Sequence, residues 1–390
     1  MVVPLRDDAR AFCSGVSEKL CELDEHEWDA LVSDENFYNS YRWLRALEHA
    51  LGETDVLTVR GPAGLVAACT LWNGGQSPGL FYLPSFVADI PGPWQQKFLW
   101  LGGRRNTHNG VSCIEGRRRF EAQAELGRCA SDYARDRGYA GFVMPYMPYS
   151  AALKFADAIG GTVILHSAEA SLEVPETGLS GVMARWRKHA RVQSKSEIAT
   201  FRRLGSRVEW AAAVELDDSL AADLITQNRS RYGGVSDHEW MQKILAGQRT
   251  AGVSHFVNAA ISKRNDDITA LTIFYSFGTA LHARYFGANY NLDLNDFRYF
   301  VLSFYEPLDY AAANGFTKLR LSTSALRAKV KRGAKIEPQA LVAKCVDGQP
   351  ICQHSANQHN LRTLRQYQDE FAGHLCRDWE LVESNPNLTS

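Results

Sequence analysis

The segment from Phe256 to Pro338 constrains the fold most, because it holds three strand-like runs, a helical run and another strand-like run in direct succession. The runs HFVNAAI, ITALTIFYSF and ALHARYFGANY are rich in β-branched and aromatic residues. Turn-forming residues separate them at 264–267 and 278–279, which is typical of two consecutive hairpins. The three runs therefore predict an antiparallel meander.

A helix is expected next, since apolar residues recur with a helical period after Asn295 and Asp296, either of which is a plausible N-cap, and the period stops at Gly315. Pro307 should kink this helix or shift its start. The following run, FTKLRLST, is strand-like and leads into the basic loop ALRAKVKRGAKIEP. The segment thus has the order βββαβ and ends in a cluster of cations.

The first half repeats this order. After two helical segments, the runs VLTVR, LVAACTLW and LFYLPSF predict a second meander, and a helix at about 121–137 and the strand YAGFVMPY follow. The helix-to-strand junctions YARDRGY and YAAANGF also resemble each other. Because one short match could be chance whereas matched element order is not, we interpret the halves as a duplication.

Length and composition agree with two domains in a soluble globular protein. A chain of 390 residues exceeds one ordinary core, and its formal charge of −1 does not by itself indicate a polyanionic partner. The sequence shows neither a signal peptide nor an apolar run of about 18 residues, so we expect no membrane span and a cytoplasmic location. The eight cysteines contain no CxxC pair and the C-terminal cysteines and histidines match no common zinc spacing, so no metal is expected.

The expected fold class is therefore α/β (α+β), with two units that each contain a mixed, mostly antiparallel sheet flanked by helices. We expect the domains at 1–172 and 173–345, as separate units that meet across a cleft. The segment 346–390 should pack back on the body through a helical apolar stripe. That stripe consists of Leu361, Leu364, Tyr367 and Phe371.

Several motifs in the same order resemble the FemABX-like branch of the GNAT superfamily. In the first half they are Trp28, Leu31, Phe37, Ser40, Trp43, Leu44, Leu47 and Glu48, and the stretch LWLGGRR; in the second half they are RYFG, FYEPLDYA, NG and KVKRGA. The resemblance implies tandem GNAT domains that form amide bonds on an amine acceptor. Some members take the acyl group from aminoacyl-tRNA to build peptidoglycan bridges or antibiotic peptides, and relatives are assigned as acyl-CoA-type N-acyltransferases.

Two basic stretches are the expected site. RWRKHARVQSKSEIATFRR has one acid, Glu197, and the stretch 320–335 has none, which suits a phosphate backbone or an anionic acceptor, although a solvated helix face is the alternative. The residues expected to bind substrate or donor are Arg185, Arg187, Lys188, Arg191, Arg284, Tyr285, Tyr305, Arg327, Lys329, Arg332 and Lys335.

Lys331 is the expected catalytic cation, because amide formation passes through an oxyanion that a fixed positive charge stabilises. The run Val330 to Ala334 resembles the Phe-Lys-x-Gly-Phe element that supplies such a lysine in this family, with Val330 and Ala334 in place of the two phenylalanines. An exposed loop lysine without a catalytic role is the alternative. Glu306 and Asp296 are candidate general bases, although a structural role is open for each, and proton transfer assisted by the substrate would need neither.

The donor is inferred from a missing loop. Acetyl-CoA-using GNAT domains bind the pyrophosphate with a glycine-rich loop, whereas this chain has NYNLDLNDFRYFVL there, without glycine and with Asp293 and Asp296. We therefore expect aminoacyl-tRNA as co-substrate, no separate cofactor, and a small amine or peptide as acceptor, as in peptidoglycan-bridge or natural-product biosynthesis. An acyl-CoA-dependent N-acyltransferase is the second hypothesis, and an inactive GNAT-fold binding protein is the third.

Overall fold

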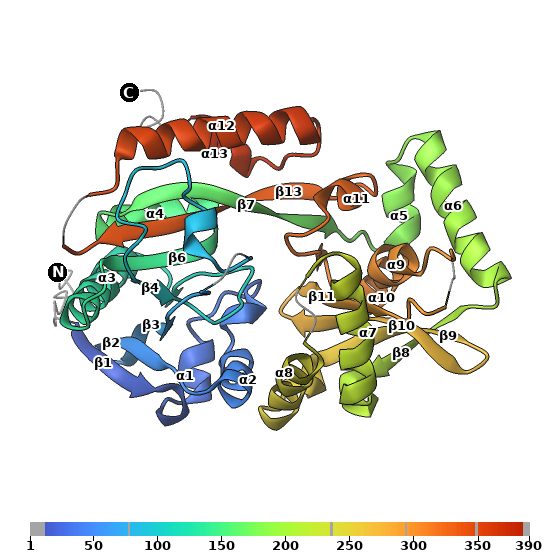
Figure 1. The fold of residues 1–390 in the computed structure, drawn as a ribbon, viewed down its shortest axis with the longest axis horizontal. Helices are drawn as coiled ribbons and strands as arrows, with labels where there is room; N and C mark the ends of the chain where they lie inside the picture. The colour runs from blue at the N-terminus through green and yellow to red at the C-terminus, as the bar shows by residue number, and fades with distance from the viewer. Residues whose placement is uncertain (1–11, 77–78, 235–236, 293–294, 348–349, 385–390) are drawn as a thin grey trace, which may run out of the picture.

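In the computed structural model, residues 12–76, 79–234, 237–292, 295–347 and 350–384 are described, and they form a mixed α/β fold around one large sheet (Figure 1). The strands are β1 Cys13–Lys19, β2 Asp55–Gly61, β3 Gly64–Trp72, β4 Phe98–Leu101, β5 Ser112–Cys113, β6 Gly141–Pro148, β7 Thr162–Glu173, β8 Arg207–Ala212, β9 Val257–Arg264, β10 Asp267–Phe277, β11 Ala280–Ala288, β12 Lys318–Arg320 and β13 Lys335–Cys345.

Helices pack along this sheet, including over its middle strands β7 and β13 (Figure 1). They are α1 Glu25–Asp29, α2 Tyr41–Leu51, α3 Arg119–Asp136, α4 Tyr149–Ile159, α5 Gly178–Ala184, α6 Lys188–Arg203, α7 Asp218–Arg231, α8 His238–Thr250, α9 Arg298–Phe300, α10 Glu306–Ala313, α11 Leu326–Val330, α12 Gln353–Phe371 and α13 Asp378–Glu383, and a π-helical turn spans Val301–Tyr305. Among the described residues, no helix is both long and apolar enough to cross a membrane.

The second half has the expected βββαβ order. Strands β9, β10 and β11 form the antiparallel meander, and β12 returns parallel to β11. The predicted helix is divided into α9, the π-helical turn and α10, and Pro307 lies in the first turn of α10, where a missing N–H is tolerated. Gly315 follows α10 with φ of 76°, a left-handed conformation that glycine adopts without strain.

The first half contains one wrong strand prediction. The hairpin β2–β3 forms as expected, but the run LFYLPSF folds into turns with a short 3₁₀ helix at Leu83–Ser85. Pro84 lacks the N–H that a central strand needs, which favours this outcome. The third strand is β4, from FLWL, which pairs antiparallel with β3 and parallel with β6.

The strands form one continuous series, and this corrects the expectation of two separate units. The order is β1-β2-β3-β4-β6-β13-β7-β12-β11-β10-β9-β8. Strand β13 comes from the second half of the chain but lies between β6 and β7, antiparallel to both, while β7 also pairs with β12. Figure 1 shows the long strands β7 and β13 crossing the molecule side by side. The domain limits at residues 172 and 345 stay predictions.

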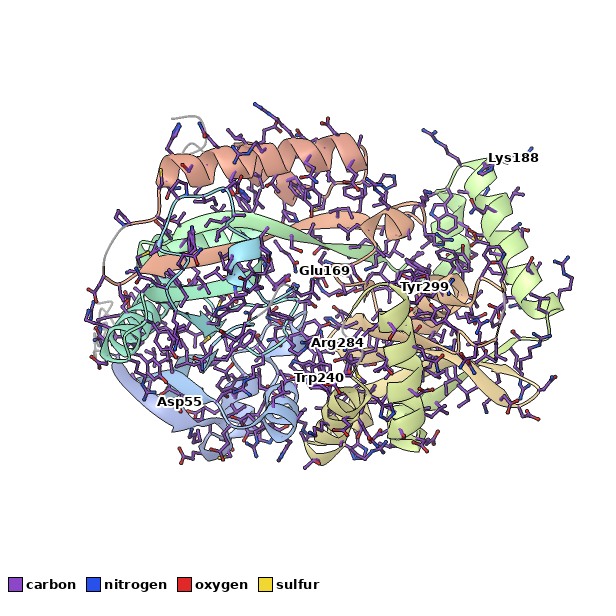
Figure 2. The ribbon with its side chains drawn as sticks, viewed as in Figure 1. Asp55, Glu169, Lys188, Trp240, Arg284 and Tyr299 are labelled. Carbon is purple, nitrogen blue, oxygen red and sulfur yellow. The ribbon has the colours of Figure 1, made fainter. Side chains whose placement is uncertain are left out.

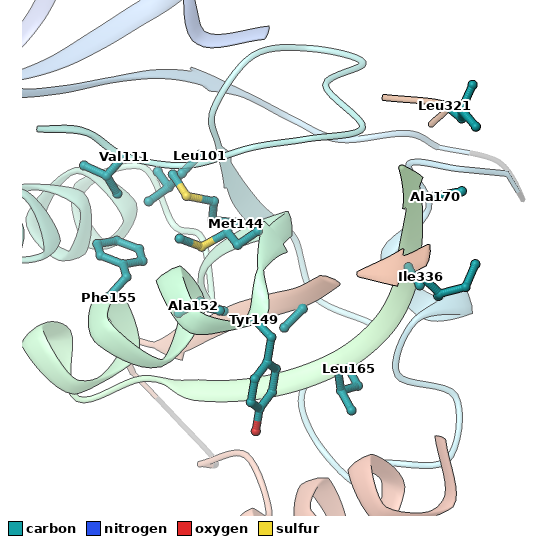
Figure 3. Packing of buried hydrophobic residues seen from close by; sticks show 14 of the residues in the cluster. Leu101, Val111, Met144, Tyr149, Ala152, Phe155, Leu165, Ala170, Leu321 and Ile336 are labelled. Atoms are coloured by element: carbon teal, nitrogen blue, oxygen red, sulfur yellow. The ribbon is translucent and has the colours of Figure 1, made fainter. Parts of the chain in front are cut away.

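The hydrophobic core likewise extends across both halves. Figure 3 shows part of it, with Met144 of β6, Leu165 of β7 and Ile336 of β13 in one cluster. Helix α12 lies against β7, where the Asn360 side chain accepts a hydrogen bond from Leu165 N at 2.7 Å and donates one to Val163 O at 2.9 Å. From the predicted stripe of this helix, Leu364 and Phe371 are buried in the same core, and Leu361 and Tyr367 pack partly buried against it.

Candidate active site

The loop of residues 102–110 fills the point where β4 and β6 diverge. Asn109 fixes it there, because its N–H bonds to Tyr146 O at 2.9 Å and its side chain donates to Leu101 O at 3.1 Å. Gly102 has φ of 94°, and a Cβ at this position would lie 2.2 Å from the Asn109 side chain. The first glycine of LWLGGRR is therefore required by the close approach of this loop to its own strand.

Both halves of the chain hold the loop. Asn106 accepts a hydrogen bond from the Trp43 indole of α2 at 2.9 Å. Gln339 of β13 donates to Thr107 O at 2.8 Å, and Arg284 of β11 donates to Arg105 O at 2.7 Å. These hydrogen bonds fix the loop in position between the two halves.

His108 of this loop forms a buried pair with Glu169 of β7. Its Nδ1 lies 2.8 Å from Glu169 Oε2, and Arg320 of β12 donates to the same oxygen at 2.8 Å. Figure 2 labels Glu169 and Arg284 in the middle of the molecule, between the elements of the two halves. Burial would raise the pKa of the Glu169 carboxyl, but Arg320 and His108 outweigh it and lower the pKa to about 2.

The ionised carboxylate determines the tautomer of His108. An ionised carboxylate only accepts hydrogen bonds, so Nδ1 of His108 must carry the proton, and in the neutral ring Nε2 then has a free lone pair. Among the described residues, Nε2 has no hydrogen-bond partner. A histidine oriented by a carboxylate in this way can accept a proton from a bound substrate.

Arg320 is held by further charged groups at the junction of β7, β12 and β13. It bonds to Glu35 and, at 3.3 Å, to Glu337, and Lys318 lies 3.0 Å from Glu337. These contacts lock Arg320 in position beside Glu169. The surroundings of His108 are therefore rigid, as a catalytic group requires.

Lys331 lies at the C-terminal end of α11 and is exposed, whereas Lys329 points inward. The Lys329 ammonium bonds to the carbonyl oxygens of Leu321 and Ser322, and burial lowers its pKa to about 7. Because the Lys329 ammonium already donates hydrogen bonds to backbone carbonyls, we interpret Lys329 as a structural residue rather than a substrate-binding one. The catalytic role of Lys331 stays a prediction.

Arg332 and Tyr305 meet in a buried network rather than on an open surface. Arg332 bonds to Glu197 of α6 at 3.0 Å and to the Tyr305 hydroxyl at 3.1 Å, and its guanidinium carbon lies 3.2 Å from the centre of the Phe300 ring. Burial and the hydrogen bond to Glu197 raise the pKa of Tyr305 to about 12. Both side chains thus connect α6 to the basic loop.

This network brings together the two basic stretches that the sequence separates by more than a hundred residues. Gly333 lies against the Trp186 indole, since a Cβ there would be 2.6 Å from its Nε1. Arg191 caps the turn between α5 and α6 by donating to Trp186 O at 2.6 Å. In these two stretches Arg185, Arg187, Lys188 and Lys331 are exposed, and in the described part of the chain none has an acidic partner. We call these four residues the basic face.

The remaining predicted residues lie outside the basic face. Arg327 pairs with Glu370 of α12, and Lys335 bonds to Gly373 O at 2.9 Å. Burial raises the pKa of Glu306, which lies 3.7 Å from Arg202 of α6. Arg284 and Tyr285 lie on β11 next to the 102–110 loop.

The stretch NYNLDLNDFRYFVL, which lacks glycine, does not have the unpaired negative charge at Asp296 that the sequence suggested. Asp296 is completely buried and paired with Arg298 at 2.8 Å, so its charge is neutralised and does not repel a diphosphate. It also accepts a hydrogen bond from Arg298 N, which is the structural role considered for it. Asp293 lies outside the described residues. The absence of glycine remains the argument against a conventional pyrophosphate loop.

His108 and Glu169 were not among the residues expected from the sequence. A usable signal exists for His108, because it follows the strand FLWL in a polar loop, and loops at the carboxyl ends of strands carry ligand sites. For Glu169, the signal is an acid within the largely apolar strand ILHSAEASLEV. In the described ranges, no three His, Cys, Asp or Glu side chains come together as a metal site.

Solved structures with the same fold are more informative than sequence comparisons. No protein-family model and no curated protein matches this sequence. The crystal structure of FemX aligns with a TM-score of 0.55 at 12% identity, over 83% of this chain and 96% of that chain. The C-terminal domain of a putative lysylphosphatidylglycerol synthetase from Agrobacterium fabrum gives 0.51 at 11% identity, over 91% and 98%. A protein of unknown function from Bacteroides thetaiotaomicron gives 0.54 at 12%, over 82% and 97%.

Proposed function

The chain has the tandem GNAT fold of the FemABX-like branch, and from this fold and the His108–Glu169 pair we propose that it is an acyltransferase that forms an amide bond on an amine acceptor. The observation that carries the proposal is the Nε2 of His108, which has no hydrogen-bond partner among the described residues and lies on a loop that both halves of the molecule hold in place. An amine must lose a proton to become a stable amide, and this nitrogen is oriented to accept it.

The proposed reaction has one bond formed and one broken. The acceptor nitrogen attacks the acyl carbonyl carbon, His108 Nε2 takes a proton from that nitrogen, and the carbonyl oxygen becomes an oxyanion. Collapse of this intermediate breaks the bond to the leaving oxygen or sulfur, which takes up the proton from His108. A fixed cation near the oxyanion lowers the barrier further, and Lys331 is our candidate for it.

We propose aminoacyl-tRNA as the donor, with an acyl-CoA as the second candidate. The basic face supports this choice, since its cations lack acidic partners among the described residues and suit a phosphate backbone. The experiment is to incubate the purified protein with labelled aminoacyl-tRNA pools and, in parallel, with acyl-CoA pools and mixed amines. Transfer of label from the tRNA pool to an amine supports the donor, and transfer from acyl-CoA alone selects the second candidate.

Acetyl-CoA should leave the melting temperature unchanged, because the second half lacks the glycine-rich loop that donates N–H groups to a pyrophosphate. A ligand at a hundredfold excess over its Kd stabilises a protein by about 2.7 kcal/mol, which is readily detected. The measurement is thermal unfolding with increasing acetyl-CoA. A saturable rise in melting temperature would reverse our order of the two donors.

Lys331→Ala should reduce turnover by roughly a hundred- to a thousandfold while the protein stays folded, because an exposed lysine supports little of the core and one oxyanion donor has about this effect. Lys331→Arg should restore only part of the rate. Lys335→Ala, a nearby charge change, is the matched control. If both alanine variants bind the donor more weakly and turn over at the wild-type rate, the loop is only an electrostatic patch.

A further inference from the structure

Three arginines from separate elements converge beside the 102–110 loop. Arg105 belongs to this loop, Arg229 to α7 and Arg284 to β11. The guanidinium carbons of Arg105 and Arg229 lie 4.4 and 5.1 Å from the centre of the same Trp240 indole ring. Arg284 joins them by donating a hydrogen bond to Arg105 O at 2.7 Å. Figure 2 labels Trp240 and Arg284 close to each other between the two halves.

None of these guanidinium groups pairs with an acid among the residues that the structure describes. The Nε atoms of Arg105 and Arg284 are buried and, within the described ranges, have no hydrogen-bond partner. The three arginines are half-buried, and the more deeply buried Arg320 and Arg332 differ from them because each bonds to a glutamate. Even partial burial of cations without an acidic partner costs free energy, so a cluster of three favours the binding of a compensating anion.

The electrostatics of the three arginines differ: burial alone would lower the pKa of Arg284, but the neighbouring tyrosine hydroxyls, Tyr285 above all, outweigh it and raise the pKa. Burial lowers the pKa of Arg105, and together with the neighbouring Arg284 and Arg229 it brings this pKa to about 10. Burial also lowers the pKa of Arg229. Aromatic rings stabilise the guanidinium groups in part, since Arg284 lies 4.8 Å from the centre of the Tyr38 ring, but rings carry no net negative charge.

We propose that Arg105, Arg229 and Arg284 bind an oxyanion, a carboxylate or a phosphate group, carried by the amine acceptor. Guanidinium groups match the geometry of such oxyanions, and an ion with two or three acceptor oxygens can bond to several of them at once. The anion would lie next to the proposed base, because Arg105 and His108 share one loop and Thr107 Oγ1 between them lies 3.5 Å from Arg284 Nη1.

The site therefore selects acceptors by charge as well as by their amine. An acceptor that places its amine at His108 and its oxyanion at the arginines is held at two points, which fixes the attacking nitrogen. The role of the acceptor rests on the proposed function. Binding of the anion itself does not, and it is measured without any catalytic turnover.

The test measures thermal unfolding and calorimetric binding with inorganic phosphate, pyrophosphate and succinate, each against sodium chloride of equal ionic strength. Wild type should be stabilised saturably by at least one of the three, and the phosphate and succinate arms distinguish the two kinds of oxyanion. Arg105→Gln and Arg229→Gln should weaken that binding about tenfold or more, the loss expected for one hydrogen bond between charged groups. Without anion, both variants should melt at or above the wild-type temperature, because they relieve repulsion.

Arg231→Gln is the matched control, because Arg231 is exposed on the same helix, stacks on Tyr290 and carries the same charge. It should bind the anions as wild type does. Equal losses in Arg231→Gln and Arg229→Gln, or stabilisation no greater than that by sodium chloride, would overturn the proposal. Anion binding by a protein that makes no amide would keep the site and refute the proposed function.

Discussion

His108→Ala should lower the rate of amide formation by about 10²- to 10⁴-fold, the contribution typical of a general base. The reason is specific to its geometry: Nδ1 bonds to an ionised Glu169, which leaves Nε2 as the proton acceptor. Substrate affinity should change less than turnover, since the imidazole acts on the proton of the attacking amine. Steady-state kinetics with saturating donor and acceptor, and circular dichroism to verify the fold, measure this.

His49→Ala provides the matched control, because His49 is exposed at the end of α2. Its kcat should equal that of the wild type. A fully folded His108→Ala protein with wild-type kcat would remove His108 from the mechanism and would favour proton transfer assisted by the substrate.

Arg320→Met should destabilise the protein by about 3–5 kcal/mol, the cost of leaving a buried charge without its partner. Arg320 bonds to Glu169 at 2.8 Å, both side chains are almost fully buried, and methionine fills similar space without charge. His108 would remain as a partner of Glu169, so unfolding by urea should show a large loss rather than complete unfolding. Arg207→Met, which removes an exposed ion pair with Asp266, should change stability little.

The same pair predicts an acid dependence of stability. In the folded protein, Arg320 and His108 hold the pKa of Glu169 at about 2, below the ordinary value of 4.5. Its stabilising contribution is therefore complete above pH 4.5 and is lost as the pH falls from there towards 2. Glu169→Gln should be less stable than wild type at pH 7, and the difference should narrow over this interval. A constant difference would show that ionised Glu169 does not stabilise the fold.

The sequence was sufficient for the second-half meander, because β9, β10 and β11 follow local patterns of alternating residues and turns. It was insufficient for β13, whose partners β6 and β7 lie more than 160 residues away in the chain. A period-2 pattern indicates a strand but not its neighbours. The expectation of separate units failed for this reason.

For the candidate site too, the sequence predicted local features but not contacts between distant residues. Its basic stretches were visible as charge runs, and the structure places them together through Arg332, Glu197 and Trp186. The His108–Glu169 pair was not visible, since its members are 61 residues apart and become neighbours only when the 102–110 loop meets β7. Charge runs are local in sequence, whereas a proton-transfer pair is defined by tertiary contact.

The most direct test of the central claim is chemical rescue of His108→Ala by imidazole, with amide product measured by mass spectrometry from labelled donor pools. Wild type should form the amide, His108→Ala should form it at least about a hundredfold more slowly, and added imidazole should restore part of the rate by entering the vacated space. A wild-type protein that forms no amide with any donor, or a variant that is as fast as wild type and indifferent to imidazole, would contradict the account.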